Sequence, residues 1–249
     1  MWLGPGQAIY AGPSLELGPH SGSVACLAVG VDDSFTVRTA THGGRTARTA
    51  LIAPRFVHQL IAHGRRMVFC YLDATSARER VCRLRMTDGD HALRYGHRQE
   101  PLLVRAGAQL ADSDSPGMAL RWLDLAGAVE PGAMDSRIGM AARYLREQTN
   151  PVLSADELAA RAGLSTSRFL HLFREHAGTS FRRYRLWARM LRVGALLSGR
   201  QDLTTAAVEA GFASPSHFSD SFHAMFGLQP SRLLAVGVRI RLLPTADLR

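Results

Sequence analysis

Polar side chains recur at helical spacing in the stretch from Gly163 to Gly178 and share one side of the helix that this spacing predicts. That side carries Ser167, Leu170, His171 and Arg174. The opposite side is apolar and carries Phe169, Leu172 and Phe173. Short or polar groups on one face of a helix can reach base edges in the major groove of DNA. The chemistry that these residues predict is therefore base recognition.

The stretch from Gly211 to Gly227 repeats this arrangement, with a helix start at Ser214 and Pro215. Its outward side carries Ser216, Ser219, Asp220 and His223. In each copy, a short helix, a tight turn at glycine and a second helix with aromatic anchors form the pattern of a helix-turn-helix unit. Asp220 would repel phosphates unless it accepts a hydrogen bond from a cytosine amino group. Two such units in one chain indicate DNA binding.

The charge of the chain also favours a polyanionic partner. The formal net charge is +9, and all thirty basic residues are arginines. The candidates for contacts with DNA phosphates are Arg168, Arg182, Arg183, Arg185 and Arg189. Residues 184–198 predict one helix of about 22 Å between the two units. Such a rigid spacer would set two recognition helices about one DNA turn apart.

The C-terminal sequence resembles the AraC/XylS transcription regulators over residues 135–234. The signature that carries the resemblance consists of Gly211, Phe212, Ser216, His217, Phe218, Phe222, Phe226, Gly227 and Pro230. The resemblance implies a bipartite DNA-binding domain at residues 133–236, a tail at residues 237–249, and a cupin-like domain at residues 1–132 that binds an effector or dimerises. It also implies double-stranded DNA, RNA polymerase and a small-molecule effector as partners of a sequence-specific regulator, such as an activator.

The N-terminal sequence indicates an α+β chain. Residues 1–73 contain short β-branched and aromatic runs separated by turn residues, which predict a small antiparallel sandwich or barrel. Residues 74–130 have helical periodicity, and one stripe is formed by Met118, Trp122, Leu125 and Val129. We interpret this stripe either as packing against the sheet or as the seam of a homodimer. Linked DNA-binding units in a dimer would raise the effective concentration at paired sites.

The sequence offers no catalytic or cofactor-binding motif, so no catalytic residue, cofactor or metal is expected and the protein is predicted not to be an enzyme. A metal-binding cupin is the first alternative, through convergence of His20, His42, His58 and His63, although no His-x-His pair is present. A DNA-repair protein of the Ada type is the second alternative. Its clustered zinc-binding cysteines and its Pro-Cys-His nucleophile are absent from this sequence.

The remaining features predict a water-soluble protein in a reducing compartment. Cys26, Cys70 and Cys82 lie far apart, as is typical of free thiols, and redox sensing by one of them is left open. The first residues lack the basic and apolar regions of a signal peptide. The longest apolar runs have about eight residues, short of the roughly 20 that span a bilayer. A cytoplasmic protein without a membrane partner is expected.

Overall fold

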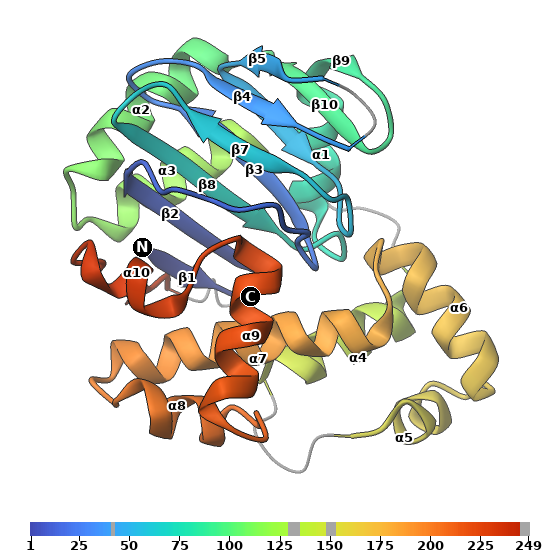
Figure 1. Ribbon diagram of the computed structural model, residues 1–249. Helices are drawn as coiled ribbons and strands as arrows, with labels where there is room; N and C mark the ends of the chain where they lie inside the picture. Colours follow the sequence, from blue (N-terminus) through green and yellow to red (C-terminus); the bar gives the residue numbers. More distant parts are fainter. Residues whose placement is uncertain (41–42, 129–134, 148–152, 245–249) are drawn as a thin grey trace.

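An N-terminal β-rich domain and a helical region form the two halves of the molecule (Figure 1). The computed structural model describes residues 1–40, 43–128, 135–147 and 153–244. The strands are β1 Trp2–Gly4, β2 Gln7–Pro13, β3 Ala25–Gly30, β4 Phe35–Arg38, β5 Arg45–Ala47, β6 Thr49–Ile52, β7 Gln59–Ala62, β8 Arg66–Leu72, β9 Met86–Gly89, β10 Leu93–His97 and β11 Arg241–Leu242. The helices are α1 Ala77–Arg85, α2 Glu100–Ala111, α3 Pro116–Ala126, α4 Ser136–Glu147, α5 Ala155–Arg161, α6 Thr166–Ala177, α7 Phe181–Ser198, α8 Leu203–Glu209, α9 Pro215–Phe226 and α10 Pro230–Ala235. The expected α+β fold class is confirmed.

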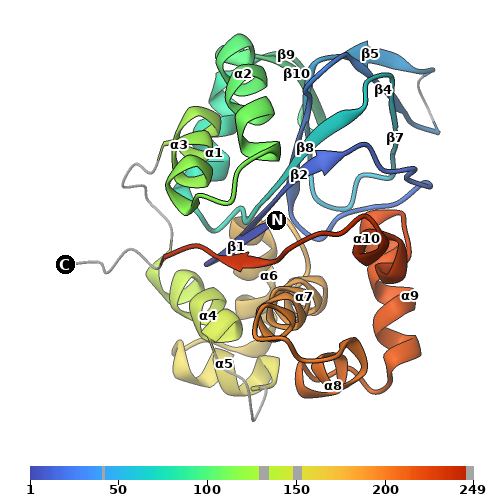
Figure 2. The same ribbon diagram turned by 90° about the vertical axis from the view of Figure 1, so that its left-hand side faces the viewer.

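The N-terminal domain has three layers, which Figure 2 shows from the side. Within the described residues, the large sheet has the strand order β11-β1-β2-β8-β3-β6-β10-β9, and a smaller sheet with the order β5-β4-β7 packs on one face. Helices α1, α2 and α3 cover the other face. The alternation along β8 explains both contacts. Val68 and Cys70 join the core under the helices, whereas Met67 and Phe69 join the core between the sheets.

Strands also occur where the sequence predicts helix or tail. The hairpin of β9 and β10 follows α1 and joins the large sheet through β6, with Tyr95 opposite Ala50. The expectation that residues 74–130 are helical is therefore corrected, because a hairpin extends the sheet in the middle of this segment. β11 lies in the expected tail and pairs in parallel with β1, with Trp2 opposite Arg241. The chain thus returns to the N-terminal domain after the helical region.

Trp122 on α3 belongs to the core of its own chain. Its side chain is 0% exposed, and its indole Nε1 donates a hydrogen bond to the carbonyl oxygen of Leu103 at 3.1 Å. Met118 and Leu125 are half-buried against the same core, and Val129 lies outside the described residues. The face of the large sheet that α3 covers is apolar, and the stripe packs on this face. This corrects the interpretation of the stripe as a dimer seam.

A buried polar cluster joins the two halves of the molecule. Asp73, directly after β8, accepts hydrogen bonds from Arg146 on α4 at 2.8 Å and from the hydroxyl of Tyr184 on α7. The Asp73 side chain is 1% exposed and that of Arg146 is 18% exposed. Burial, followed by the Asp73 carboxylate, raises the pKa of Tyr184 above its usual value. The ion pair is therefore shielded from water and fixes α4 and α7 against the N-terminal domain.

Candidate functional site

The first helix-turn-helix unit is formed by α5 and α6 and begins at a capping box. The hydroxyl of Ser154 accepts from the backbone N–H of Glu157, and the Glu157 carboxylate accepts from the N–H of Ser154. Gly163 in the turn has φ +65°, a left-handed conformation that favours glycine. Phe169 and Phe173 are fully buried and pack against the first turn of α7. These contacts fix which side of α6 faces outward.

The outward side of α6 carries the residues that the sequence predicts to read bases in the first unit. Four side chains are exposed there: Ser167, Leu170, His171 and Arg174. The hydroxyl of Ser165 accepts from the N–H of Arg168, so the helix starts with a satisfied backbone donor. The exposed face therefore combines polar groups for base edges with one apolar group suited to a thymine methyl.

The second helix-turn-helix unit, α8 and α9, is built like the first. Asp202 and Ser214 cap the two helices by accepting from the N–H groups of Thr205 and His217. Gly211 in the turn has φ +88°. Three of the base-reading residues predicted on α9 are exposed, namely Ser216, Asp220 and His223, and Ser219 is half-buried. The structure thus places all four on one helix, with one at the edge of its exposed side.

The arginines near α7 differ in exposure. Arg168 and Arg182 are exposed, whereas Arg185 and Arg189 are half-buried. The Nε of Arg189 is buried beside the turn of the second unit, where a Cβ at Gly211 would lie 3.5 Å from it. Burial, followed by Arg185, lowers the pKa of Arg189. Arg189 therefore packs on the second unit with part of its guanidinium.

Arg183 contacts the N-terminal domain. Its Nη2 donates to the carbonyl oxygen of Ser21 at 2.5 Å and to the Ser21 hydroxyl at 3.0 Å. Burial, followed by the neighbouring Arg55, lowers the pKa of Arg183. The prediction that Arg183 contacts phosphate is therefore corrected, because the first turn of α7 lies against the N-terminal domain and this side chain is engaged there.

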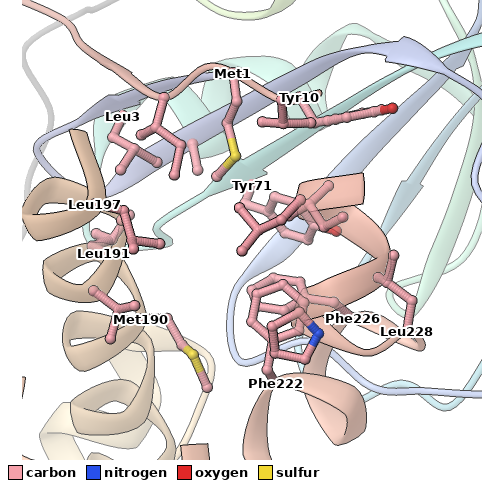
Figure 3. Close-up of a pocket in the computed structure, with 18 of the residues that line it drawn as sticks. Met1, Leu3, Tyr10, Tyr71, Met190, Leu191, Leu197, Phe222, Phe226 and Leu228 are labelled. Carbon is pink, nitrogen blue, oxygen red and sulfur yellow. The ribbon is translucent and has the colours of Figure 1, made fainter. Parts of the chain in front are cut away.

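An apolar pocket lies between the N-terminal domain and the helical region (Figure 3). Its cavity measures about 80 Å³. Strands β1, β2 and β8 and helices α7 and α9 contribute to its lining, which includes Leu3, Tyr10, Tyr71, Met190, Phe222 and Phe226. A second hollow of about 590 Å³ shares Leu203 and Ile240 with this lining and adds Arg200, Arg239 and Arg241. The pocket could not be predicted from the sequence, because its walls come from distant segments that no local spacing connects.

The structure brings together two of the four histidines considered for a metal. His20 and His58 are buried, and their ring centres lie 4.4 Å apart. His63 is bonded to the hydroxyl of Thr36 instead, and His42 lies outside the described residues. Within the described part of the chain, no group of three metal-ligating side chains occurs. Burial, followed by His20, lowers the pKa of His58 to about 4, so this side chain is neutral near pH 7.

The cysteines are buried thiols. Burial raises the pKa of Cys26 to about 12 and also raises the pKa values of Cys70 and Cys82. Thiols with raised pKa values react slowly with oxidants, because the thiolate is the reactive form.

The helices in the described part of the chain lack the combination of length and apolar character that a membrane span requires.

The C-terminal part of the chain is similar to known transcription regulators. Residues 158–235 match the model of a family described as a helix-turn-helix domain, which is of the AraC type. The "Probable transcriptional regulator LumQ" of Photobacterium leiognathi is 32% identical over 90 residues, which cover 36% of this chain and 36% of that protein. The "HTH-type transcriptional regulator CdhR" of Pseudomonas aeruginosa is 28% identical over 144 residues, 51% of this chain and 43% of that protein. The chain thus matches less than half of the length of these curated relatives.

Solved structures share the fold over nearly the whole chain. An apo ToxT variant from Vibrio cholerae has a TM-score of 0.62 at 12% identity, over 93% of this chain and 97% of that chain. Wild-type ToxT with an unsaturated fatty acid bound has a TM-score of 0.58 at 12% identity, over 93% and 96% of the two chains. At this identity the likeness concerns the fold.

Proposed function

We propose that this chain, whose residues 158–235 form an AraC-type helix-turn-helix domain, is a sequence-specific DNA-binding regulator of transcription. The observation that carries the proposal is a pair of helix-turn-helix units joined by α7, each with an exposed polar face on its second helix. A helix of this kind enters the major groove and contacts base edges. Selection of bound sequences from a randomised DNA pool tests the proposal. A bipartite motif is expected, and a pool that shows no enrichment would contradict it.

The partners of this function follow from charge and family. Arg168, Arg182, Arg185 and Arg189 are the proposed phosphate contacts, and the net charge of +9 supports binding to a polyanion. RNA polymerase is the proposed protein partner, and the cytoplasm is the proposed location of this chain. The N-terminal domain is proposed to sense an effector or to assemble, and not to catalyse. A homodimer is proposed as well, through a surface other than the buried side chain of Trp122.

His171→Ala is expected to relax the base preference at one or two adjacent base pairs of the first half-site. His171 is exposed on α6, and loss of one base contact costs about 1–3 kcal/mol at the position concerned. Binding to single-base variants of the selected site measures this effect. His91→Ala, at an exposed histidine of the N-terminal domain, is the matched control. A uniform loss of affinity across all sites would contradict the assignment of His171 to base reading.

We further propose that the apolar pocket binds an effector with an apolar body and an anionic group. The lining of the cavity is apolar, and the hollow beside it carries Arg200 together with Arg239 and Arg241, which pair with Asp114. Burial of apolar surface would favour binding, and a guanidinium would pair with a carboxylate. The unsaturated fatty acid bound to ToxT is a molecule of this class. Oleate is therefore a suitable probe for this chain.

Leu191→Trp is expected to weaken oleate binding about tenfold and to leave DNA binding unchanged. Leu191 on α7 lines the cavity of about 80 Å³ (Figure 3), and the larger indole would occupy the space that the ligand needs. Forcing extra volume into a filled apolar site costs about 1–3 kcal/mol. Titration calorimetry measures the oleate affinity, and fluorescence anisotropy measures the DNA affinity. Leu84→Trp, at a side chain 71% exposed on α1, is the control. Unchanged oleate affinity in the Leu191 variant would place the effector elsewhere.

A further inference from the structure

A loop of the N-terminal domain contacts the end of the second recognition helix. This β2–β3 loop comprises residues 14–24. The backbone N–H of Gly18 donates to the carbonyl oxygen of Gly227 at 2.8 Å, and the N–H of Ser21 donates to that of Ala224 at 3.3 Å. Carbonyl groups in the last turn of a helix have no donor within the helix. The β2–β3 loop therefore supplies donors to the end of α9.

The β2–β3 loop is also held by the N-terminal domain. His20 and His58 exchange both of their backbone hydrogen bonds, at 2.9 and 3.0 Å. The side chain of Gln59 donates to the carbonyl oxygen of Leu17 at 3.1 Å. The loop is thus fixed at the start of β7 on one side and at α9 on the other. A displacement of the loop changes the contact between the N-terminal domain and the second recognition helix.

Arg183 connects the same loop to α7, the helix that follows the first unit. Its guanidinium donates to both the carbonyl oxygen and the hydroxyl of Ser21, and the N–H of Ser21 donates to Ala224 on α9. Ser21 therefore contacts both α7, which follows the first recognition helix, and α9, which is the second recognition helix. Arg182, the neighbour of Arg183 in the sequence, is exposed instead.

The β2–β3 loop forms one wall of the apolar pocket. Leu15 and Leu17 line the cavity together with Phe222 and Phe226 of α9. The cavity of about 80 Å³ is smaller than the roughly 150 Å³ that accommodates one benzene molecule, so a ligand with a long apolar chain must displace a wall. Most of the other walls are strands and helices with regular backbone hydrogen bonds, although Leu228, Val238 and Ile240 also line the cavity from outside these elements. The β2–β3 loop is therefore one of the walls that can open at a low free-energy cost.

We propose that Arg183 is a positioning residue that holds the β2–β3 loop through Ser21 and thereby keeps the two recognition helices in one relative arrangement. A ligand in the pocket releases the loop. This inference rests on the proposed DNA-binding function. With the loop held, the protein prefers one spacing between the two half-sites. With the loop released, α9 turns more freely relative to α6, and the preference for that spacing falls.

The test compares Arg183→Met with Arg182→Met in the full chain. Arg182 is a proposed phosphate contact, so its variant is expected to weaken binding to both DNA sites equally and to leave the loop exchange and the spacing preference unchanged. Methionine keeps the aliphatic stem at both positions and removes the guanidinium. Amide hydrogen exchange of residues 14–24 reports on the loop. Affinity for the selected DNA site, compared with the same site carrying one inserted base pair between the half-sites, reports on the spacing preference. Loss of the charge-assisted bonds in Arg183→Met is expected to speed loop exchange and to reduce the spacing preference, each about tenfold. Oleate is expected to shift the wild type in the same direction.

Equal loop exchange and an equal spacing preference in the two methionine variants would overturn the inference. A second contradicting result is an Arg183→Met variant that binds all DNA more weakly, with unchanged loop exchange and a salt slope smaller by about one, because a phosphate contact behaves in this way. A wild type that selects a DNA motif without a spacing preference would overturn this inference alone. A wild type that selects no DNA sequence would contradict the DNA-binding function itself.

Discussion

Arg146→Met is expected to lower the free energy of unfolding by about 3–5 kcal/mol, because it leaves the buried Asp73 carboxylate without its cation. Asp73 is 1% exposed, and Arg146 approaches it to 2.8 Å. Methionine replaces the aliphatic part of the arginine, so most of the apolar contact of α4 is kept and the loss reports mainly on the charge. Urea unfolding followed by circular dichroism measures the change.

Two further variants separate this effect from a general weakening of the protein. Combining Arg146→Met with Asp73→Asn is expected to restore part of the stability, because no charge is then left buried. Arg66→Met removes ion pairs with Asp32 and Asp112, in which every side chain is about one-third exposed or more, and is expected to cost less than about 1 kcal/mol. A loss in Arg146→Met no larger than that in Arg66→Met would show that the buried pair does not stabilise the contact between the two halves.

Trp122→Ala is expected to destabilise the N-terminal domain by about 3–5 kcal/mol and to leave the oligomeric state of the folded protein unchanged. The indole fills the core between α3 and the large sheet, and its Nε1 donates to the carbonyl oxygen of Leu103 at 3.1 Å. Truncation would leave a cavity in this core. Thermal unfolding measures the stability, and light scattering below the unfolding temperature measures the mass.

Arg121→Ala is the control for this variant, because Arg121 is exposed on the same helix. Its effect on stability is expected to stay within about 0.5 kcal/mol. A wild-type dimer that becomes a monomer on Trp122→Ala, with its stability retained, would re-establish α3 as the dimer seam.

The helix-turn-helix units could be predicted from the sequence because short-range rules define them. Ser154 and Glu157 form the capping box, and Gly163 has the left-handed φ of the turn, all within ten residues of one another. The aromatic spacing also identified the buried side of α6, with Phe169 and Phe173 at 0% exposed. The assignment of the opposite side to base reading stays a prediction.

The contacts between the two halves could not be predicted, because they join residues that are remote in the sequence. Ser21 and Arg183 are 162 residues apart, and nothing in the run of arginines at the start of α7 distinguishes Arg183 from Arg182. Likewise, the helical stripe on α3 indicates that one face is covered, but periodicity alone does not identify the covering surface. Trp122 packs on a sheet of its own chain, which only the tertiary structure reveals.

The pairing of β11 with β1 has a consequence for the order of events during synthesis. β1 leaves the ribosome before all the other described strands and β11 after them, so the edge of β1 has no partner in its own chain while the intervening residues are made. An open strand edge pairs readily with other chains, and partly made proteins aggregate by this route. Release of the segment from Arg241 to Leu242 covers the edge of β1 and makes the two-residue strand β11 the outermost strand, and an edge strand this short offers few groups for pairing. The edge of β1 is therefore covered only after both helix-turn-helix units have emerged, and a chain that ends before Arg241 leaves it open.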